Sequence, residues 1–186
     1  MEDHFAALSE AVLRTSSSAP KIRGWARHLA AVFEGGGRLL ACGNGGSAAE
    51  AQHLTGELVG RFLGERGPLS AISLHADTSA GTAIVNDFGE HELFARQVRA
   101  HGRTGDVLVC LSTSGSSQNV VAAAKAAHEL RVTTWALTGP APNPLASLCD
   151  DAVAVAAPSV ATVQEIHLAL VHGLCAALDA ALGVSA

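Results

Sequence analysis

Two pairs of polar side chains have the spacing that proton transfer or metal binding requires. His53 and Glu57 are four residues apart, so on a helix they project about 40° apart on one face. An imidazole and a carboxylate placed in this way can both reach one ligand or one metal ion. The same pair is common on solvated helix faces, and its spacing alone favours that simpler interpretation.

The second pair lies near the end of the chain, in the segment VQEIHLALVH. Gln164 and His172 are eight residues apart, roughly 80° around a helix axis and about two turns along it. Both could then line one side of a pocket while Ile166, Leu170 and Val171 pack in the core. A histidine in an apolar helix is more often a hydrogen-bonded core residue than a ligand, so this pair alone is a weak signal.

A glycine-rich loop precedes the first pair. The segment RLLACGNGGSAAEAQ predicts a buried strand over 39–42, a polar loop over 43–47 and then a helix. The amides of such a loop and the positive end of the helix attract an anion, and glycine lets the backbone approach it closely. Phosphate capture beside acid–base groups suggests an enzyme that acts on a phosphorylated metabolite.

A second loop, STSGSS over 112–117, carries five hydroxyl groups around one glycine. Serine and threonine also cap helices without a ligand, but one cap needs one hydroxyl, so we favour phosphate binding. The loop lacks the GxxxxGK[ST] and GxGxxG patterns, which argues against a nucleoside triphosphate and a dinucleotide. His75, Asn86 and Asp87 also lie near expected element ends and could reach a sugar hydroxyl.

Alternating strands and helices must position these residues. Short, continuously apolar strands between helical segments predict a parallel sheet that is covered on both faces. In such a sheet the crossovers are right-handed and ligands bind at the carboxyl ends of the strands, where both loops leave. Two amphipathic helices come first, and the apolar stripe of Phe5, Leu8 and Val12 is expected to pack on a core or on another subunit. We expect strands near 38–42, 69–74, 106–111, 133–137 and 152–156, and helices near 47–62, 77–86, 90–101, 117–129 and 160–183.

Length and composition indicate one globular domain with a large core. The chain has 186 residues, 48% of them hydrophobic. The net charge is −5 and there is no basic block, which argues against nucleic-acid binding. Three features predict a cytoplasmic protein without a membrane span: four widely spaced cysteines, no apolar run of about 18 residues and no leader-like N-terminus.

Taken together, these segments resemble the sugar isomerase (SIS) domain, and within it the phosphoheptose isomerase family. The resemblance covers nearly the whole chain in the family's order. It implies an α/β fold, a three-layer α/β/α sandwich with a five-stranded parallel sheet, in a single SIS domain over 1–186. It also implies a homotetramer with active sites at subunit interfaces and with the N-terminal helices of 1–35 in subunit contacts. The matching pieces are CGNGGSAAEAQHLTGELVGRF from Cys42, AIVNDFG from Ala83, GDVLVCLSTSGSSQNVVAAA from Gly105, ALTG from Ala136 and VQEIHLALVH from Val163.

The resemblance further implies roles for individual residues. Glu57 and His172 match the family's catalytic pair. In members that hold zinc, the ligands match His53, Glu57, Gln164 and His172, so we expect one Zn²⁺ per subunit. Residues at the positions of the family's substrate binders are Asn44, Gly45, Gly46, Ser47, Arg61, Asn86, Asp87, Ser112, Thr113, Ser114, Ser117 and Gln164.

The resemblance predicts an isomerase that converts sedoheptulose 7-phosphate to a glycero-manno-heptose 7-phosphate through an enediol(ate). One alternative is another SIS isomerase, such as a 6-phospho-3-hexuloisomerase. A second is a non-catalytic protein that senses a sugar phosphate or binds the replication initiator DnaA, but such relatives lack the equivalents of Glu57 and His172. Thr162 stands where relatives commonly have Arg, so this segment does not predict which sugar is preferred.

Overall fold

A five-stranded parallel sheet forms the centre of the structure, a computed structural model that describes residues 1–184. Its strands are β1 (Leu39–Cys42), β2 (Ala71–Ser73), β3 (Val107–Ser112), β4 (Thr133–Thr138) and β5 (Asp151–Ala154). They are ordered β2-β1-β3-β4-β5, and each neighbouring pair is parallel. The strand order reverses between β1 and β3, and open α/β sheets bind ligands at the carboxyl ends of the strands at such a point. The loops over 43–45 and 113–117 leave from there.

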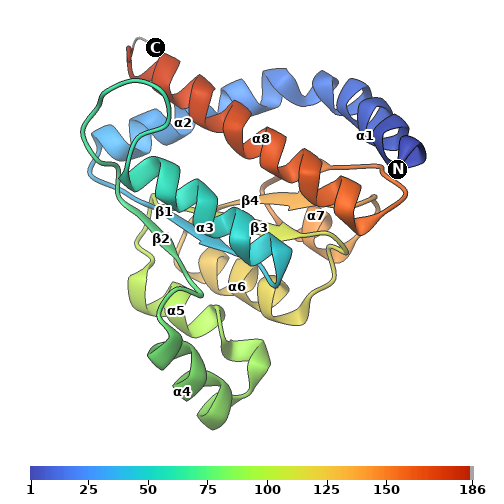
Figure 1. Cartoon of the computed structure of the whole chain (residues 1–186). Coiled ribbons are helices and arrows are strands. Elements are labelled where there is room, and N and C mark those ends of the chain that lie inside the picture. The colour runs from blue at the N-terminus through green and yellow to red at the C-terminus, as the bar shows by residue number, and fades with distance from the viewer. Residues whose placement is uncertain (185–186) are drawn as a thin grey trace.

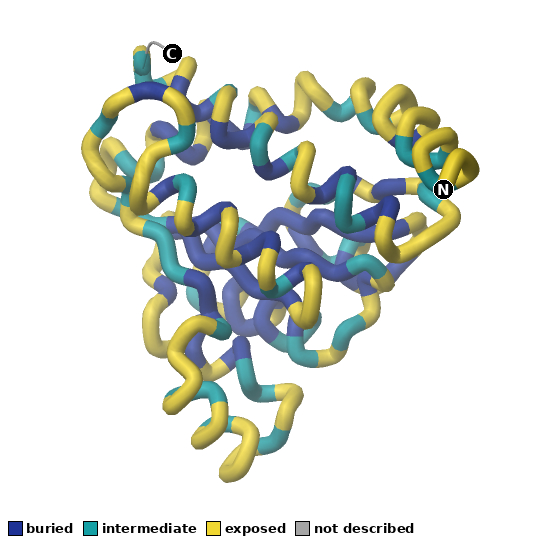
Figure 2. Tube along the Cα trace, in the orientation of Figure 1, coloured by how far each residue is buried: buried dark blue, intermediate teal, exposed yellow. Residues whose placement is uncertain are grey.

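Helices cover both faces of the sheet, which confirms the predicted three-layer arrangement (Figure 1). Leu54 and Leu174 belong to the hydrophobic cluster on one face, and Phe94 and Val98 to the cluster on the other. The strands between them are mostly buried (Figure 2). The first face carries α2 (Ala19–Glu34), α3 (Gly46–Val59) and α8 (Val160–Ala181), and the second carries α5 (Ala95–His101), α6 (Gln118–Glu129) and α7 (Pro144–Leu148).

The remaining helices extend from this sandwich. Helix α1 (Glu2–Thr15) continues through the short η1 (Ser16–Ser18) into α2 and packs against α8. Within the predicted apolar stripe, Phe5 and Val12 remain largely exposed in this chain. Helix α4 (Thr78–Phe88), followed by η2 (Glu90–Glu92), projects from the other side of the molecule and has no buried residue (Figures 1 and 2).

All five predicted strands are present, but some helix bounds differ from the predicted ones. The helix expected over 47–62 ends at Val59, because Gly60 takes a non-helical backbone. The helix expected over 90–101 is divided between η2 and α5. Helix α7 was not predicted, although Asn143 followed by proline is a typical helix start; the Asn143 side chain accepts a hydrogen bond from the amide of Ala146.

Helix α8 is the one described helix that is long and apolar enough to cross a membrane by length and composition. The sequence pattern predicts no such apolar run. In the structure α8 packs against α1, α2 and α3 and carries His167 and Asp179, both buried. These contacts are those of a core helix, and they bring its polar side chains next to α3.

Candidate active site

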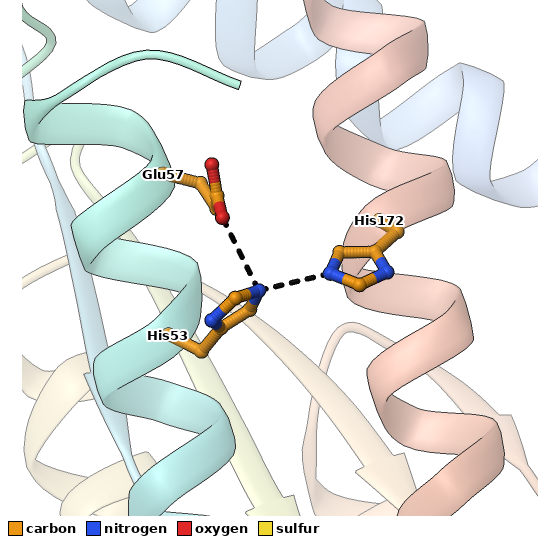
Figure 3. A group of neighbouring side chains, drawn as sticks. All are labelled: His53, Glu57 and His172. Carbon is orange, nitrogen blue, oxygen red and sulfur yellow. Dashed lines mark hydrogen bonds and ion pairs between the residues drawn. The ribbon is translucent and has the colours of Figure 1, made fainter. Parts of the chain in front are cut away.

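Three side chains from two helices converge on one point (Figure 3). His53 and Glu57 extend from successive turns of α3, and His172 reaches them from α8. Nε2 of His53 lies 2.9 Å from Nε2 of His172 and 3.3 Å from Oε1 of Glu57. The ring of Phe62 lies 5.7 Å from that of His172 and flanks the site. We call these three residues, His53, Glu57 and His172, the triad.

The donor atoms of the triad suit a zinc ion. All three lie within 4.8 Å of one another. Tetrahedral zinc with bonds of about 2.0–2.1 Å places its ligand atoms about 3.3–3.4 Å apart, close to the separations in the triad. The fourth predicted ligand, Gln164, lies elsewhere: its amide packs on Gly46, where an added Cβ would be 2.3 Å from Nε2. Within residues 1–184 no hydrogen bond joins Gln164 to the triad.

Helix α3 begins in the first predicted phosphate loop. Asn44, in that loop, and Asn119, at the start of α6, exchange two side-chain hydrogen bonds of 2.9 Å, so the two loops are linked directly. The N-cap residues Gly45 and Ser117 make no side-chain capping bond. An anion can take the place of such a cap, because the first amides of a helix have no partner within it. Ser47 is buried in the first turn of α3.

Ser112 organises the second predicted phosphate loop. Its buried hydroxyl lies 3.0 Å from that of Ser117 and 3.4 Å from that of Ser114, and it accepts the amide of Gly115. Because a hydroxyl can both donate and accept, these groups can turn their protons toward an anion. Gly115 has φ +61°, and a Cβ there would lie 2.1 Å from Oδ1 of Asn143, so only glycine lets this loop pack on the start of α7. Thr113 completes the loop and is partly buried.

An open cleft of about 660 Å³ lies along α3 beside the triad. His53, Glu57 and Arg61 all line it. The guanidinium of Arg61 is exposed and donates to the carbonyl of Leu63. Arg61 therefore lies at the cleft.

Two predicted substrate binders are not brought to the triad within this chain. Asn86 and Asp87 are exposed on α4, on the opposite side of the molecule from α8, and Nδ2 of Asn86 donates to Oδ1 of Asp87 at 2.7 Å (Figure 1). His75 contacts Ser73 instead, at 3.0 Å, and burial lowers the pKa of its imidazole.

Thr162 does not line the cleft. It is fully buried and belongs to the N-cap of α8, where Ser159 accepts its amide and lies 2.9 Å from its hydroxyl.

Further residues near the site were not identified from the sequence as parts of it. His167 is a core residue whose Nε2 lies 3.1 Å from the carbonyl oxygen of Thr138. Its Nδ1 lies 3.7 Å from a carboxylate oxygen of Glu50, another buried residue. Glu50 and Asn119 had no local spacing signal, because their partners His167 and Asn44 are distant in the sequence.

Comparisons with known proteins identify the family of this chain. Residues 3–139 match the SIS domain family. The chain is 64% identical to the phosphoheptose isomerase of Streptomyces coelicolor over 166 residues, which are 89% of this chain and 72% of that protein. Solved phosphoheptose isomerases from Neisseria gonorrhoeae and Francisella tularensis superpose with TM-scores of 0.89 and 0.91, at 41% and 36% identity, over 96% of each chain. The chain therefore belongs to the phosphoheptose isomerase family of SIS-domain proteins.

Proposed function

We propose that this chain converts D-sedoheptulose 7-phosphate to D-glycero-D-manno-heptose 7-phosphate. The observation that carries this proposal is the convergence of His53, Glu57 and His172 beside a phosphate-binding edge of the sheet. An aldose–ketose isomerisation needs one group that moves a proton between two carbons and another that moves a proton between their oxygens. The carboxylate of Glu57, which lines the cleft, and the imidazole of His172, which joins it in the triad, meet both needs.

The phosphate is held at the carboxyl ends of β1 and β3. Ser47 and the hydroxyls of the second loop supply donors, together with the uncapped first amides of α3 and α6. His53 lies seven residues beyond Gly46, about 10 Å along α3, so an open-chain sugar phosphate anchored at the helix start can present its carbonyl end to the triad. Binding energy at the phosphate then fixes the reacting carbons. We assign the substrate contacts to Asn44, Gly45, Gly46, Ser47, Arg61, Ser112, Thr113, Ser114, Ser117 and Gln164.

In this mechanism Glu57 takes the proton from C1 of the ketose and leaves an enediol(ate). His172 moves a proton between O1 and O2. Glu57 then returns its proton to C2, which gives the aldose and restores the carboxylate. Nε2 of His53 lies 3.3 Å from Oε1 of Glu57 and 2.9 Å from Nε2 of His172. His53 therefore fixes the distance between these two side chains.

We propose that the triad, with Gln164 as a fourth ligand, holds one Zn²⁺. When bound, the ion supplies a positive charge that polarises the carbonyl and stabilises negative charge on its oxygen. The amide of Gln164 has to leave Gly46 to join the set. Glu57 and His172 are assigned both as zinc ligands and as the acid–base pair, and these two roles compete. An activity assay with and without a chelator distinguishes the two roles.

We also propose that residues 1–186, of which the last two lie outside the described part, form one SIS domain. We place it in the cytoplasm as a homotetramer, with residues 1–35 in subunit contacts. Exposed apolar side chains on the N-terminal helices support the subunit contacts, among them Phe5 at 62% and Val12 at 48% exposure. A groove of about 490 Å³ between α1, α2 and α8 continues the same apolar surface.

Self-association also accounts for α4. This helix exposes Val85 and Phe88 and has no fully buried residue in its own chain. Asn86 and Asp87 on it lie away from their own triad. In the proposed assembly they complete the substrate site of a neighbouring subunit.

The purified protein incubated with sedoheptulose 7-phosphate tests the function. We expect NMR to show the heptose aldose, and a parallel sample with a 3-hexulose 6-phosphate to remain unchanged. Turnover of the hexulose alone would assign the chain to another SIS isomerase. Binding of the sugar phosphate without turnover, with zinc supplied, would indicate a sensing protein instead.

A further inference from the structure

The guanidinium of Arg66 closes the end of α3 that carries Glu57. Its Nη2 donates to the backbone carbonyl of Glu57 at 2.7 Å, and its Nη1 donates to that of Leu58 at 2.9 Å. The last carbonyls of a helix have no partner within it, and a positive charge is favourable at that end. Because α3 stops before Gly60, Arg66 bonds carbonyls that a further turn would have bonded; the carbonyl of Leu58 also accepts the backbone amide of Leu69, at 3.0 Å.

The same guanidinium is paired with a carboxylate on α8. Nε of Arg66 lies 3.0 Å from Oδ1 of Asp179, and only 5% and 9% of the two side chains is exposed. Asp179 follows His172 by seven residues, two turns on nearly the same face of the helix. One side chain from the loop after α3 thus joins the helix segments that carry Glu57 and His172.

We propose that Arg66 and Asp179 are positioning residues of the isomerase site, which together fix Glu57 relative to His172. The proposal rests on the roles assigned above to those two side chains. Cys175 lies between His172 and Asp179 on α8 and is buried. Burial, together with the negative charges of Glu57 and Asp179, raises the pKa of its thiol to about 12, although the positive charge of Arg66 opposes this. The buried Arg66–Asp179 pair therefore lies close to the carboxylate of Glu57.

A structural ion pair and a positioning pair differ in what their removal does. Loss of one partner leaves the other charge buried and unpaired, which destabilises a protein whatever the pair's role. Replacement of both by apolar side chains of similar volume is often neutral for stability. The double variant R66M/D179L is therefore the informative one, because it removes both charges but cannot bond the carbonyls of Glu57 and Leu58.

The test compares the wild type, R66M/D179L, R66K and a control, R38M. Arg38 is also an arginine beside a buried aspartate, 3.5 Å from Asp106, but it lies at the opposite end of β1. We expect R66M/D179L to keep its melting temperature but to lose about 10- to 100-fold in kcat. Its KM should change less than about threefold, because the phosphate is held elsewhere. Lysine keeps the positive charge but lacks the paired N–H donors of the guanidinium, so the kcat of R66K should lie between those of the wild type and the double variant. R38M should keep the wild-type kcat.

Amide hydrogen exchange gives a second measurement that does not depend on turnover. Peptides covering residues 54–60 should exchange faster in R66M/D179L than in the wild type. A double variant with wild-type kcat and unchanged exchange would overturn the proposal and leave the isomerase function intact. If the wild type itself shows no turnover, the proposed function fails. Unchanged exchange in the double variant would then separately overturn the positioning role of Arg66 and Asp179. If the double variant does not fold, a wild-type kcat and unchanged exchange in R66K would overturn it.

Discussion

Nε2 of His53 lies 2.9 Å from Nε2 of His172, although 119 residues separate the two histidines in the sequence. At this distance a hydrogen bond joins the two rings, with its proton on one of the facing nitrogens. A metal ion can take the place of that proton and use both lone pairs, and the carboxylate of Glu57 lies beside them. The contact therefore leads to a direct prediction about metal binding.

We expect the purified protein to hold about one Zn²⁺ per chain. His53→Ala and His172→Ala each remove one of three converging donors, so each should weaken the zinc affinity by more than about 100-fold. Elemental analysis after dialysis, and competition with a chromophoric chelator, measure this. His101→Ala, at an exposed position on α5, is the control and should leave the zinc content unchanged. Full zinc retention in both triad variants would exclude this metal site.

Gly46 provides a second prediction. A Cβ there would lie 2.3–2.8 Å from three atoms of the Gln164 amide, so Gly46→Ala should displace that side chain. We expect kcat/KM to fall about tenfold or more, because both residues belong to the proposed substrate site. The control is Gly24→Ala on α2, where an added Cβ meets nothing within 4 Å. Wild-type kinetics in Gly46→Ala would show that neither Gln164 nor this loop contributes to the proposed substrate site.

The fold could be predicted largely from the sequence, because strands buried on both faces are continuously apolar and the helices between them are long. Helix α7 was missed because five residues carry little periodicity. In the site, His53 and Glu57 could be paired from local spacing alone. Their meeting with His172 depends on how α3 and α8 pack, so spacing could not reveal it and only the family resemblance suggested it. The bonds of Arg66 depend on where α3 stops, which no local pattern encodes.

Asp151 predicts how stability depends on pH. Burial opposes its ionisation, but hydrogen bonds from Nζ of Lys21 (2.5 Å) and Nε1 of Trp25 (2.8 Å) outweigh this and lower its pKa. Since the folded value lies below the unfolded value of about 3.9, the carboxylate stabilises the fold above about pH 4, and this contribution disappears as the pH falls further. Asp151→Asn should therefore destabilise the protein at pH 7 and much less at pH 3.

Urea unfolding followed by tryptophan fluorescence measures this difference. Asp3→Asn, at an exposed position on α1, serves as the control and should change stability little at either pH. An equal loss of stability at both pH values in Asp151→Asn would show that the charge of Asp151 does not contribute.

The proposed assembly predicts complementation between two inactive variants. Glu57→Gln removes the base of one site, and Asp87→Asn removes a residue that we assign to the neighbouring site. Each alone should be inactive, but coexpression in equal amounts should restore roughly a quarter of the wild-type activity, in sites with both native residues. Native mass spectrometry would establish that mixed oligomers form. Mixed oligomers without activity would mean that no site is shared.

Deuterium incorporation tests most directly whether Glu57 moves a carbon-bound proton. With sedoheptulose 7-phosphate in D₂O, the wild type should release an aldose that carries deuterium at C2. Glu57→Gln should still bind the sugar phosphate but give neither aldose nor exchange at C1. Two results would contradict proton transfer by Glu57. One is an aldose from the wild type with no deuterium at C2, and the other is aldose formation by Glu57→Gln at the wild-type rate.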